Sequence, residues 1–223
     1  MGKIIGIGGG FEGKDFVILA KYIISLTGKS TPNYLQIPTT CYDFGDKGEF
    51  GFYAKMGCPS EFLYLTHPYI NEDIIAEKIR NADIIHVPGG NLKFCMDIWN
   101  KTGAGKYLKE AFDDGKVLYG QSSGSMCWFS QGYDDCGSES SFMLVDCLGL
   151  LPYTNCPHYE CEAWQGFNDA VKLSDFSGLA LENETAFLYI DGKTEVLVAD
   201  ARPDARVWFF DKENDFIRTE YKS

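Results

Sequence analysis

Short apolar segments alternate with longer amphipathic segments through the first 120 residues, and this alternation restricts the fold more than any other feature of the chain. Segments with the length and composition of strands cover 3–8, 33–37, 61–66, 83–87 and 116–120. Segments with apolar residues at helical spacing cover 15–26, 48–56, 71–80, 92–100 and 106–112. Strands that alternate with helices form a parallel sheet with helices on both faces. The sequence therefore predicts an α/β fold with a parallel sheet at its core.

The last third of the chain has a different pattern. Residues 185–190 and 194–199 predict two strands, and Asp191-Gly192 between them supplies the positive φ angles of a tight hairpin turn. Residues 207–210 predict one more strand. No internal repeat and no linker-like composition divides the chain. We therefore expect residues 1–223 to form a single α/β domain, with antiparallel strands added at one side of the sheet.

The net charge of the chain argues against two classes of partner. Acidic residues outnumber basic ones by 32 to 20, for a net charge of −12. Such a surface repels phosphate backbones and anionic lipid, so we expect no nucleic-acid partner and no membrane partner. No apolar run approaches the roughly 20 residues that cross a bilayer, and the first residues lack the pattern of a signal peptide. We expect a monomer or a homodimer.

The cysteines bear on location and on metal binding. The eight cysteines include no Cys-x-x-Cys pair, which favours thiols in a reducing cytoplasm over a disulfide framework. Cys156 and Cys161 flank His158, but a zinc site needs further ligands at a suitable spacing. We therefore expect a cytoplasmic protein without a metal or a cofactor.

The segment Gly120-Gln121-Ser122-Ser123-Gly124 has the spacing of a nucleophile elbow. An expected strand enters it and a short helical pattern, residues 126–129, follows it. A strand that turns at once into a helix exposes the serine hydroxyl above the sheet edge and requires small residues two positions to either side. A serine that only caps a helix has the same local composition, but the strand before it favours the elbow. We therefore predict that Ser122 is the nucleophile of a serine hydrolase.

A serine nucleophile needs a base, and three histidines are available. His86 lies inside an apolar strand, where a core role is expected. His67 lies at a strand end before a proline and has the pattern of a surface residue. His158 lies in a loop downstream of the elbow, which makes it the candidate base.

The carboxylate that would orient the histidine is less well determined. Asp134 and Asp135 follow the elbow and have the required chemistry. Glu182 and Glu184, just before the hairpin, are further candidates. Composition alone does not indicate which of these four carboxylates orients the histidine.

Two glycine-rich segments follow expected strands, and we predict a different role for each. In Gly89-Gly90-Asn91, small residues let backbone N–H groups approach a substrate, so this segment is a candidate for the second oxyanion donor beside Ser123. Residues 6–11 form an imperfect Gly-x-Gly-x-x-Gly, with Phe11 where the third glycine belongs. We expect a loop near the active site there, in preference to a nucleotide-binding turn.

Three motifs, in order, resemble the serine peptidase family of dipeptidase E (α-aspartyl dipeptidase) and cyanophycinase. They are Val87-Pro88-Gly89-Gly90-Asn91, the segment from Tyr119 to Phe129, and Pro157-His158-Tyr159. The strand–helix alternation and the hairpin also agree, so the resemblance covers most of the chain. It implies a three-layer domain like that of the class I glutamine amidotransferases, with a flavodoxin-like core.

The resemblance also implies a role for each site residue. Ser122 would be the nucleophile, His158 the base and Asp135 the acid, with the backbone amides of Gly90 and Ser123 forming the oxyanion hole. The implied reaction is hydrolysis of a peptide bond in a short, often acidic, peptide through an acyl-enzyme, without a metal or a cofactor.

The chain departs from the family pattern in the elbow and near the acid. Ser123 stands where the family often has alanine, and Asp134 beside Asp135 competes for the role of the acid. An acidic substrate also requires a local cation in a negatively charged chain. Candidates for that cation are Arg202, Arg206 and Lys93.

Three other functions fit parts of the sequence. An α/β-hydrolase esterase shares the elbow, but its catalytic histidine usually lies near the end of the chain. Here the last histidine is His158, and 65 residues follow it. A cysteine-dependent amidotransferase would need a cysteine at the elbow, whereas Cys127 lies within the following helix. A non-catalytic binding protein on the same scaffold is the third alternative.

Overall fold

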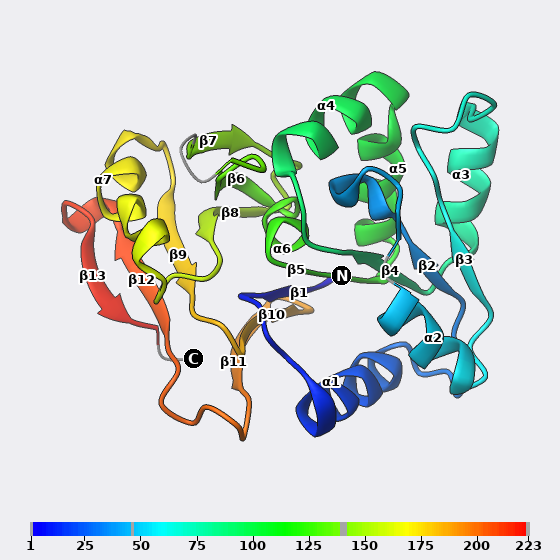
Figure 1. Ribbon diagram of the computed structural model, residues 1–223, viewed down its shortest axis with the longest axis horizontal. Coiled ribbons are helices and arrows are strands. Elements are labelled where there is room, and N and C mark those ends of the chain that lie inside the picture. Colours follow the sequence, from blue (N-terminus) through cyan, green and yellow to red (C-terminus); the bar gives the residue numbers. More distant parts are fainter. Residues whose placement is uncertain (1, 46, 139–141, 222–223) are drawn as a thin grey trace.

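A computed structural model describes residues 2–45, 47–138 and 142–221, and within these residues the strands form two sheets (Figure 1). The first sheet has the strand order β11-β10-β1-β5-β4-β2-β3. Its strands are β1 (Lys3–Ile7), β2 (Tyr34–Gln36), β3 (Ser60–Phe62), β4 (Ile84–Val87), β5 (Val117–Gln121), β10 (Thr185–Ile190) and β11 (Lys193–Val198). Strands β1 to β5 pair in parallel, and β10 and β11 pair antiparallel. The parallel core and the added hairpin are as the sequence predicts.

Helices cover both faces of this first sheet (Figure 1). One face carries α1 (Gly13–Leu26) and α2 (Lys47–Lys55), and the other carries α3 (Glu72–Asn81), α4 (Leu92–Thr102) and α5 (Ala104–Asp113). Successive strand residues point to opposite faces, so Ile5 packs with the side of α1 and α2 while Ile4 packs with the side of α3 to α5. The result is three layers around a buried parallel core.

The second sheet has the strand order β13-β12-β9-β8-β6-β7. Its strands are β6 (Phe129–Asp134), β7 (Met143–Asp146), β8 (Leu151–Cys156), β9 (Ser177–Leu181), β12 (Val207–Asp211) and β13 (Ile217–Glu220). Short helical turns complete the chain: η1 (Pro38–Cys41), η2 (Glu162–Gly166), α7 (Phe167–Ala170), η3 (Val171–Leu173) and η4 (Lys212–Asn214). Phe167 of α7 packs against Tyr133 and Phe210 in a separate cluster.

This second sheet corrects the expected arrangement of the C-terminal strands. The hairpin of β10 and β11 does extend the first sheet, because β10 pairs with β1. The expected strand at 207–210 does not extend it. It forms β12 and pairs with β9, a strand that the sequence pattern did not indicate. None of the helices in the described part of the chain has both the length and the apolar character needed to cross a membrane.

Candidate active site

The turn after β5 has the geometry of a nucleophile elbow. Ser122 has φ 54° and ψ −127°, a strained conformation for a residue with a side chain. A Cβ on Gly120 would lie 2.2 Å from the carbonyl oxygen of Gly124, and a Cβ on Gly124 would lie 2.0 Å from the carbonyl oxygen of Val87. Both glycines are therefore required by close backbone approach. The following helix, α6 (Ser123–Met126), is one turn long, so its dipole contributes little at Ser122.

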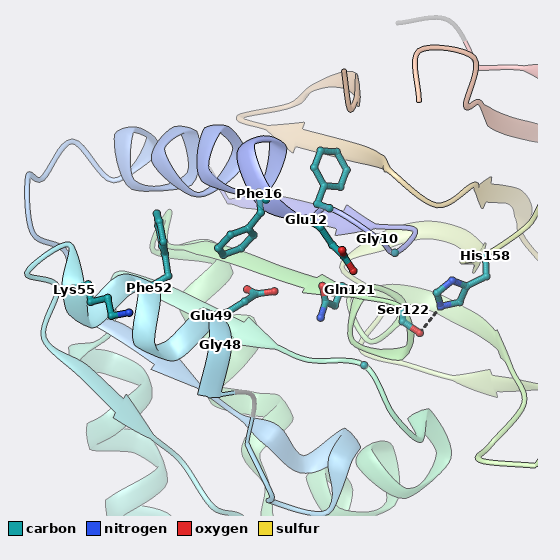
Figure 2. A pocket seen from close by; sticks show the side chains of 14 residues that line it. Gly10, Glu12, Phe16, Gly48, Glu49, Phe52, Lys55, Gln121, Ser122 and His158 are labelled. Atoms are coloured by element: carbon teal, nitrogen blue, oxygen red, sulfur yellow. Dashed lines mark hydrogen bonds between the residues drawn. The ribbon is translucent and has the colours of Figure 1, made fainter. Parts of the chain in front are cut away.

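Ser122 and His158, the nucleophile and base that the sequence selects, form a hydrogen-bonded pair. Oγ of Ser122 lies 2.8 Å from Nε2 of His158 (Figure 2). His158 follows β8 of the second sheet, and its backbone N–H donates to the carbonyl of Gly8, at the end of β1, at 3.3 Å. Its ring centroid lies 5.3 Å from that of Trp164. The nucleophile thus comes from one sheet and the base from the other.

Asn183, in the connection between β9 and β10, supports the histidine from behind. Its Oδ1 lies 2.6 Å from Nδ1 of His158. Because an amide oxygen only accepts hydrogen bonds, Nδ1 carries the proton and Nε2 presents its lone pair to the hydroxyl of Ser122. The three side chains therefore form the chain of contacts of a nucleophile, a base and an orienting group.

Asn183 is itself held by an ion pair. Its backbone N–H donates to Oε2 of Glu160 at 3.0 Å, and Nη1 of Arg202 donates to Oε1 of the same carboxylate at 2.8 Å. Burial raises the pKa of Glu160, but these two donors outweigh burial, so the pKa lies below its usual value. The ionised Glu160 fixes the loop that carries Asn183.

The structure does not bring Asp135 to the imidazole. Oδ1 of Asp135 accepts the backbone N–H of Gly137 at 3.0 Å and so closes a local turn. The carboxylate of Asp135 is therefore held within its own loop. Asn183, and not an acid, contacts Nδ1 of His158. Glu182 and Glu184 also turn elsewhere, toward Arg202, at 4.0 and 3.7 Å.

Asp134 has a structural position beneath the elbow. The side chain is buried, and its Oδ2 accepts the backbone N–H groups of Leu92 at 2.9 Å and Cys136 at 3.1 Å. Oδ1 lies 2.9 Å from Oγ of Ser123. Burial raises the pKa of Asp134, and the donors at Leu92 and Ser123 oppose that rise. The carboxylate joins the start of α4 to the elbow.

The two expected oxyanion donors are the backbone N–H groups of Gly90 and Ser123, and the side chain of Ser123 connects the segments that carry them. Oγ of Ser123 lies 2.7 Å from the carbonyl oxygen of Gly90, in addition to its contact with Asp134. A Cβ on Gly89 would lie 3.2 Å from Cβ of Ser122, and one on Gly90 would lie 2.2 Å from the carbonyl oxygen of Thr40. Within the described residues, the N–H groups of Gly90 and Ser123 have no protein acceptor. Both are available to a developing oxyanion.

A cavity of about 770 Å³ opens beside the nucleophile (Figure 2). The glycine segment after β1 and the side chains of α1 and α2 form its walls, and the end of β5 forms its floor. Its lining residues are Gly9, Gly10, Phe11, Glu12, Gly13, Phe16, Gly48, Glu49, Phe52, Lys55, Gly89, Gln121, Ser122 and His158. The segment at 6–11 thus lies beside the active site, as expected. In the part of the chain that the structure describes, no group of His, Cys, Asp and Glu side chains is arranged to hold a metal ion.

The other candidate bases and nucleophiles lie outside this cavity. His86 is fully buried in β4, and burial lowers its pKa to about 3. His67 is exposed, and its Nδ1 accepts the backbone N–H of Tyr69. Cys127 is buried, and burial raises the pKa of its thiol well above the ordinary value. None of the three lines the cavity beside Ser122.

The cations suggested for an acidic substrate are engaged elsewhere. Arg202 pairs with Glu160, Arg206 with Glu220, and Lys93 with Asp97. None of these basic side chains lines the cavity beside Ser122.

Comparison with known proteins gives matches along most of the chain. The model of peptidase family S51 matches residues 4–197. The uncharacterized peptidase YgaJ of Bacillus subtilis (strain 168) is 30% identical over 166 residues, which are 73% of this chain and 70% of that protein. The crystal structure of a peptidase from an acI-B1 Actinobacterium aligns with a TM-score of 0.73 at 17% identity, over 100% of this chain and 95% of that one. A putative peptidase E protein from Listeria monocytogenes EGD-e aligns with a TM-score of 0.69 at 19% identity, over 90% and 100% of the two chains. These two structures share the fold of the chain.

Proposed function

Since the chain belongs to peptidase family S51 and is a serine peptidase, we propose that it hydrolyses short peptides through an acyl-enzyme on Ser122. One observation carries this proposal: Nε2 of His158 lies 2.8 Å from Oγ of Ser122, while Asn183 holds Nδ1 on the opposite side of the ring. The esterase and the non-catalytic protein are weaker alternatives, because the family and its relatives are peptidases.

The first half of the reaction forms the ester. Nε2 of His158 removes the hydroxyl proton as Oγ of Ser122 attacks the peptide carbonyl. The backbone N–H groups of Gly90 and Ser123 stabilise the resulting oxyanion. The imidazolium then gives its proton to the leaving amine, and the carbon–nitrogen bond breaks.

The second half releases the acid. Water attacks the ester carbonyl while His158 removes its proton, and the same two donors stabilise the second oxyanion. As the oxyanion collapses, the bond between the carbonyl carbon and Oγ of Ser122 breaks, and His158 returns the proton to Oγ. Asn183 keeps the tautomer correct in both halves. The roles of Ser122, His158, Gly90 and Ser123 in this proposal are those expected from the sequence, whereas Asn183 replaces Asp135.

Labelling with a fluorophosphonate tests the nucleophile directly. Wild-type protein at neutral pH should incorporate the label at Ser122, whereas Ser122→Ala should not and His158→Ala should react far more slowly. A panel of dipeptides and of matched esters then tests the reaction class. Labelling of Ser122→Ala, or rapid hydrolysis of esters with no peptide cleaved, contradicts the proposal.

A further inference from the structure

The cavity beside Ser122 contains more negative than positive side chains. Apart from His158, its charged lining residues are Glu12, Glu49 and Lys55. Figure 2 shows the carboxylates of Glu12 and Glu49 on opposite walls, both directed toward the space beside Gln121, with Lys55 at the end of the cavity away from Ser122. The substrate residue that occupies this space therefore meets two carboxylates.

The carboxylate of Glu49 is fixed in place. The residue is 9% exposed, and Oη of Tyr119 donates to its Oε2 at 2.7 Å. Nε2 of His86 lies 3.5 Å from the same oxygen, and the ring of His86 stacks on that of Tyr119 at 4.3 Å between centroids. A charge held in a partly water-excluded wall acts more strongly than one on a mobile surface side chain.

Aromatic rings form much of the remaining wall. Phe11, Phe16 and Phe52 line the cavity, and the rings of Phe16 and Phe52 lie 5.1 Å apart between centroids, edge to face. Such a surface suits the methylene stem of a long side chain. Aromatic faces also attract cations.

The position of the base determines which part of a peptide enters this cavity. The leaving amine must receive its proton from Nε2 of His158, so it lies on the side of the imidazole. In Figure 2 the cavity extends from Ser122 away from His158. The residue whose carbonyl is attacked therefore lies toward Glu12 and Glu49.

We propose that this cavity binds a positively charged nitrogen group on the residue whose carbonyl Ser122 attacks, and that Glu12 and Glu49 select for that group. This inference rests on the proposed peptidase function and assigns its substrate class. An acidic residue at this position, as the family resemblance implies, does not match the charges of the cavity. The cation has two sources in a peptide, a basic side chain or a free α-ammonium.

Dipeptides that differ only in charge provide the test. We would measure kcat/KM for Lys-Leu, norleucyl-Leu and Asp-Leu, each with a free and an acetylated N-terminus. A preference for Lys-Leu over norleucyl-Leu of roughly tenfold or more that survives acetylation assigns the cavity to a side chain. Equal rates for these two, with loss of turnover on acetylation, assign it to the α-ammonium.

Charge-neutral variants connect the preference to the two carboxylates. In the double variant Glu12→Gln/Glu49→Gln, the preference in kcat/KM for the cationic substrate should fall roughly tenfold. Ser122 of this variant should still be labelled by the fluorophosphonate. The matched control, Glu77→Gln on the exposed surface of α3, should leave the preference unchanged. If the double variant is poorly folded, protection of wild-type Ser122 from labelling by n-butylammonium, compared with 1-butanol, gives the same information.

Two outcomes overturn the inference. One is that Asp-Leu is the best substrate of the wild-type protein. The other is that the preference for a cation is as large in the labelled double variant as in the wild type. Absence of both labelling and peptide cleavage in the wild type would instead reject the proposed function, and this inference with it.

Discussion

Replacing Asn183 with alanine removes the acceptor for Nδ1–H of His158 and leaves Ser122 and the oxyanion donors in place. The lost bond is 2.6 Å long, and it becomes charge-assisted when His158 takes up the proton of Ser122. A hydrogen bond to a charged group is worth about 1.5–3 kcal/mol, and a tenfold change in rate corresponds to about 1.4 kcal/mol. We therefore expect kcat/KM to fall roughly 10- to 150-fold.

Asn183→Asp separates orientation from charge. The aspartate keeps the acceptor and adds a negative charge beside the imidazole, which stabilises the protonated ring. Ser122 needs the neutral ring for attack, so the acidic limb of the pH–rate profile should move to higher pH. Above that limb, Asn183→Asp should be faster than Asn183→Ala.

The rate of fluorophosphonate labelling as a function of pH is the assay, because it requires no knowledge of the substrate. Asp135→Asn is the matched control, since its carboxylate closes a turn on Gly137 and does not touch the ring. A labelling rate of Asn183→Ala within twofold of wild type would refute the assignment. An equal loss of labelling rate in Asp135→Asn would also refute it.

Three other perturbations follow from the geometry. Ser123→Ala removes the hydroxyl between the carbonyl of Gly90 and the buried Asp134, so kcat should fall roughly three- to tenfold with little change in KM, measured by steady-state kinetics. Gly120→Ala places a Cβ 2.2 Å from a backbone oxygen and should lower the free energy of unfolding in urea by about 1–3 kcal/mol, whereas Gly51→Ala, with open space around it in α2, should not lower it. Burial lowers the pKa of His86 to about 3 in the folded protein, whereas the ordinary pKa of histidine in an unfolded chain is about 6.5. The unfolded state therefore binds a proton as the pH falls below about 6.5, and the folded state does not until about pH 3. The free energy of unfolding should therefore decrease by about 1 kcal/mol more in wild type than in His86→Gln between pH 7 and pH 5.5, and equal pH slopes would contradict this reasoning.

The first sheet was predictable because its signals are local. Strands β1, β3 and β4 are each followed by a helix with a clear apolar face, namely α1, α3 and α4. Helix α3 even has the expected cap, with Oδ1 of Asn71 accepting the N–H of Ile74 at 3.0 Å. The elbow was predictable for the same reason. Its glycines are required by close backbone contacts within a few residues of Ser122 and with the neighbouring strand.

The second sheet was not predictable because its strands carry weak alternation. Gly132 interrupts β6, Pro152 lies in β8, and Gly178 lies in β9. Their pairing depends on partners far along the chain, such as β9 with β12. The single domain and the monomer or homodimer expected from the sequence stay predictions.

Asn183 was missed for a related reason. Its neighbours Glu182 and Glu184 were considered because a carboxylate is the commoner partner of a catalytic histidine, whereas an amide has no such signal in a single sequence. Only the fold places Oδ1 of Asn183 against His158, and only the fold shows that Asp134 supports the elbow.

The passage of the chain between the two sheets has a consequence for its synthesis. The chain leaves the first sheet just after Ser122, between β5 and β6, and returns to it at Asn183, between β9 and β10. A nascent chain that has folded only its parallel strands therefore exposes a serine without a base. Ser122 has no imidazole partner until the second sheet has formed and has brought His158 to it. The proposed active site is therefore complete only in the fully folded chain, when both sheets are present.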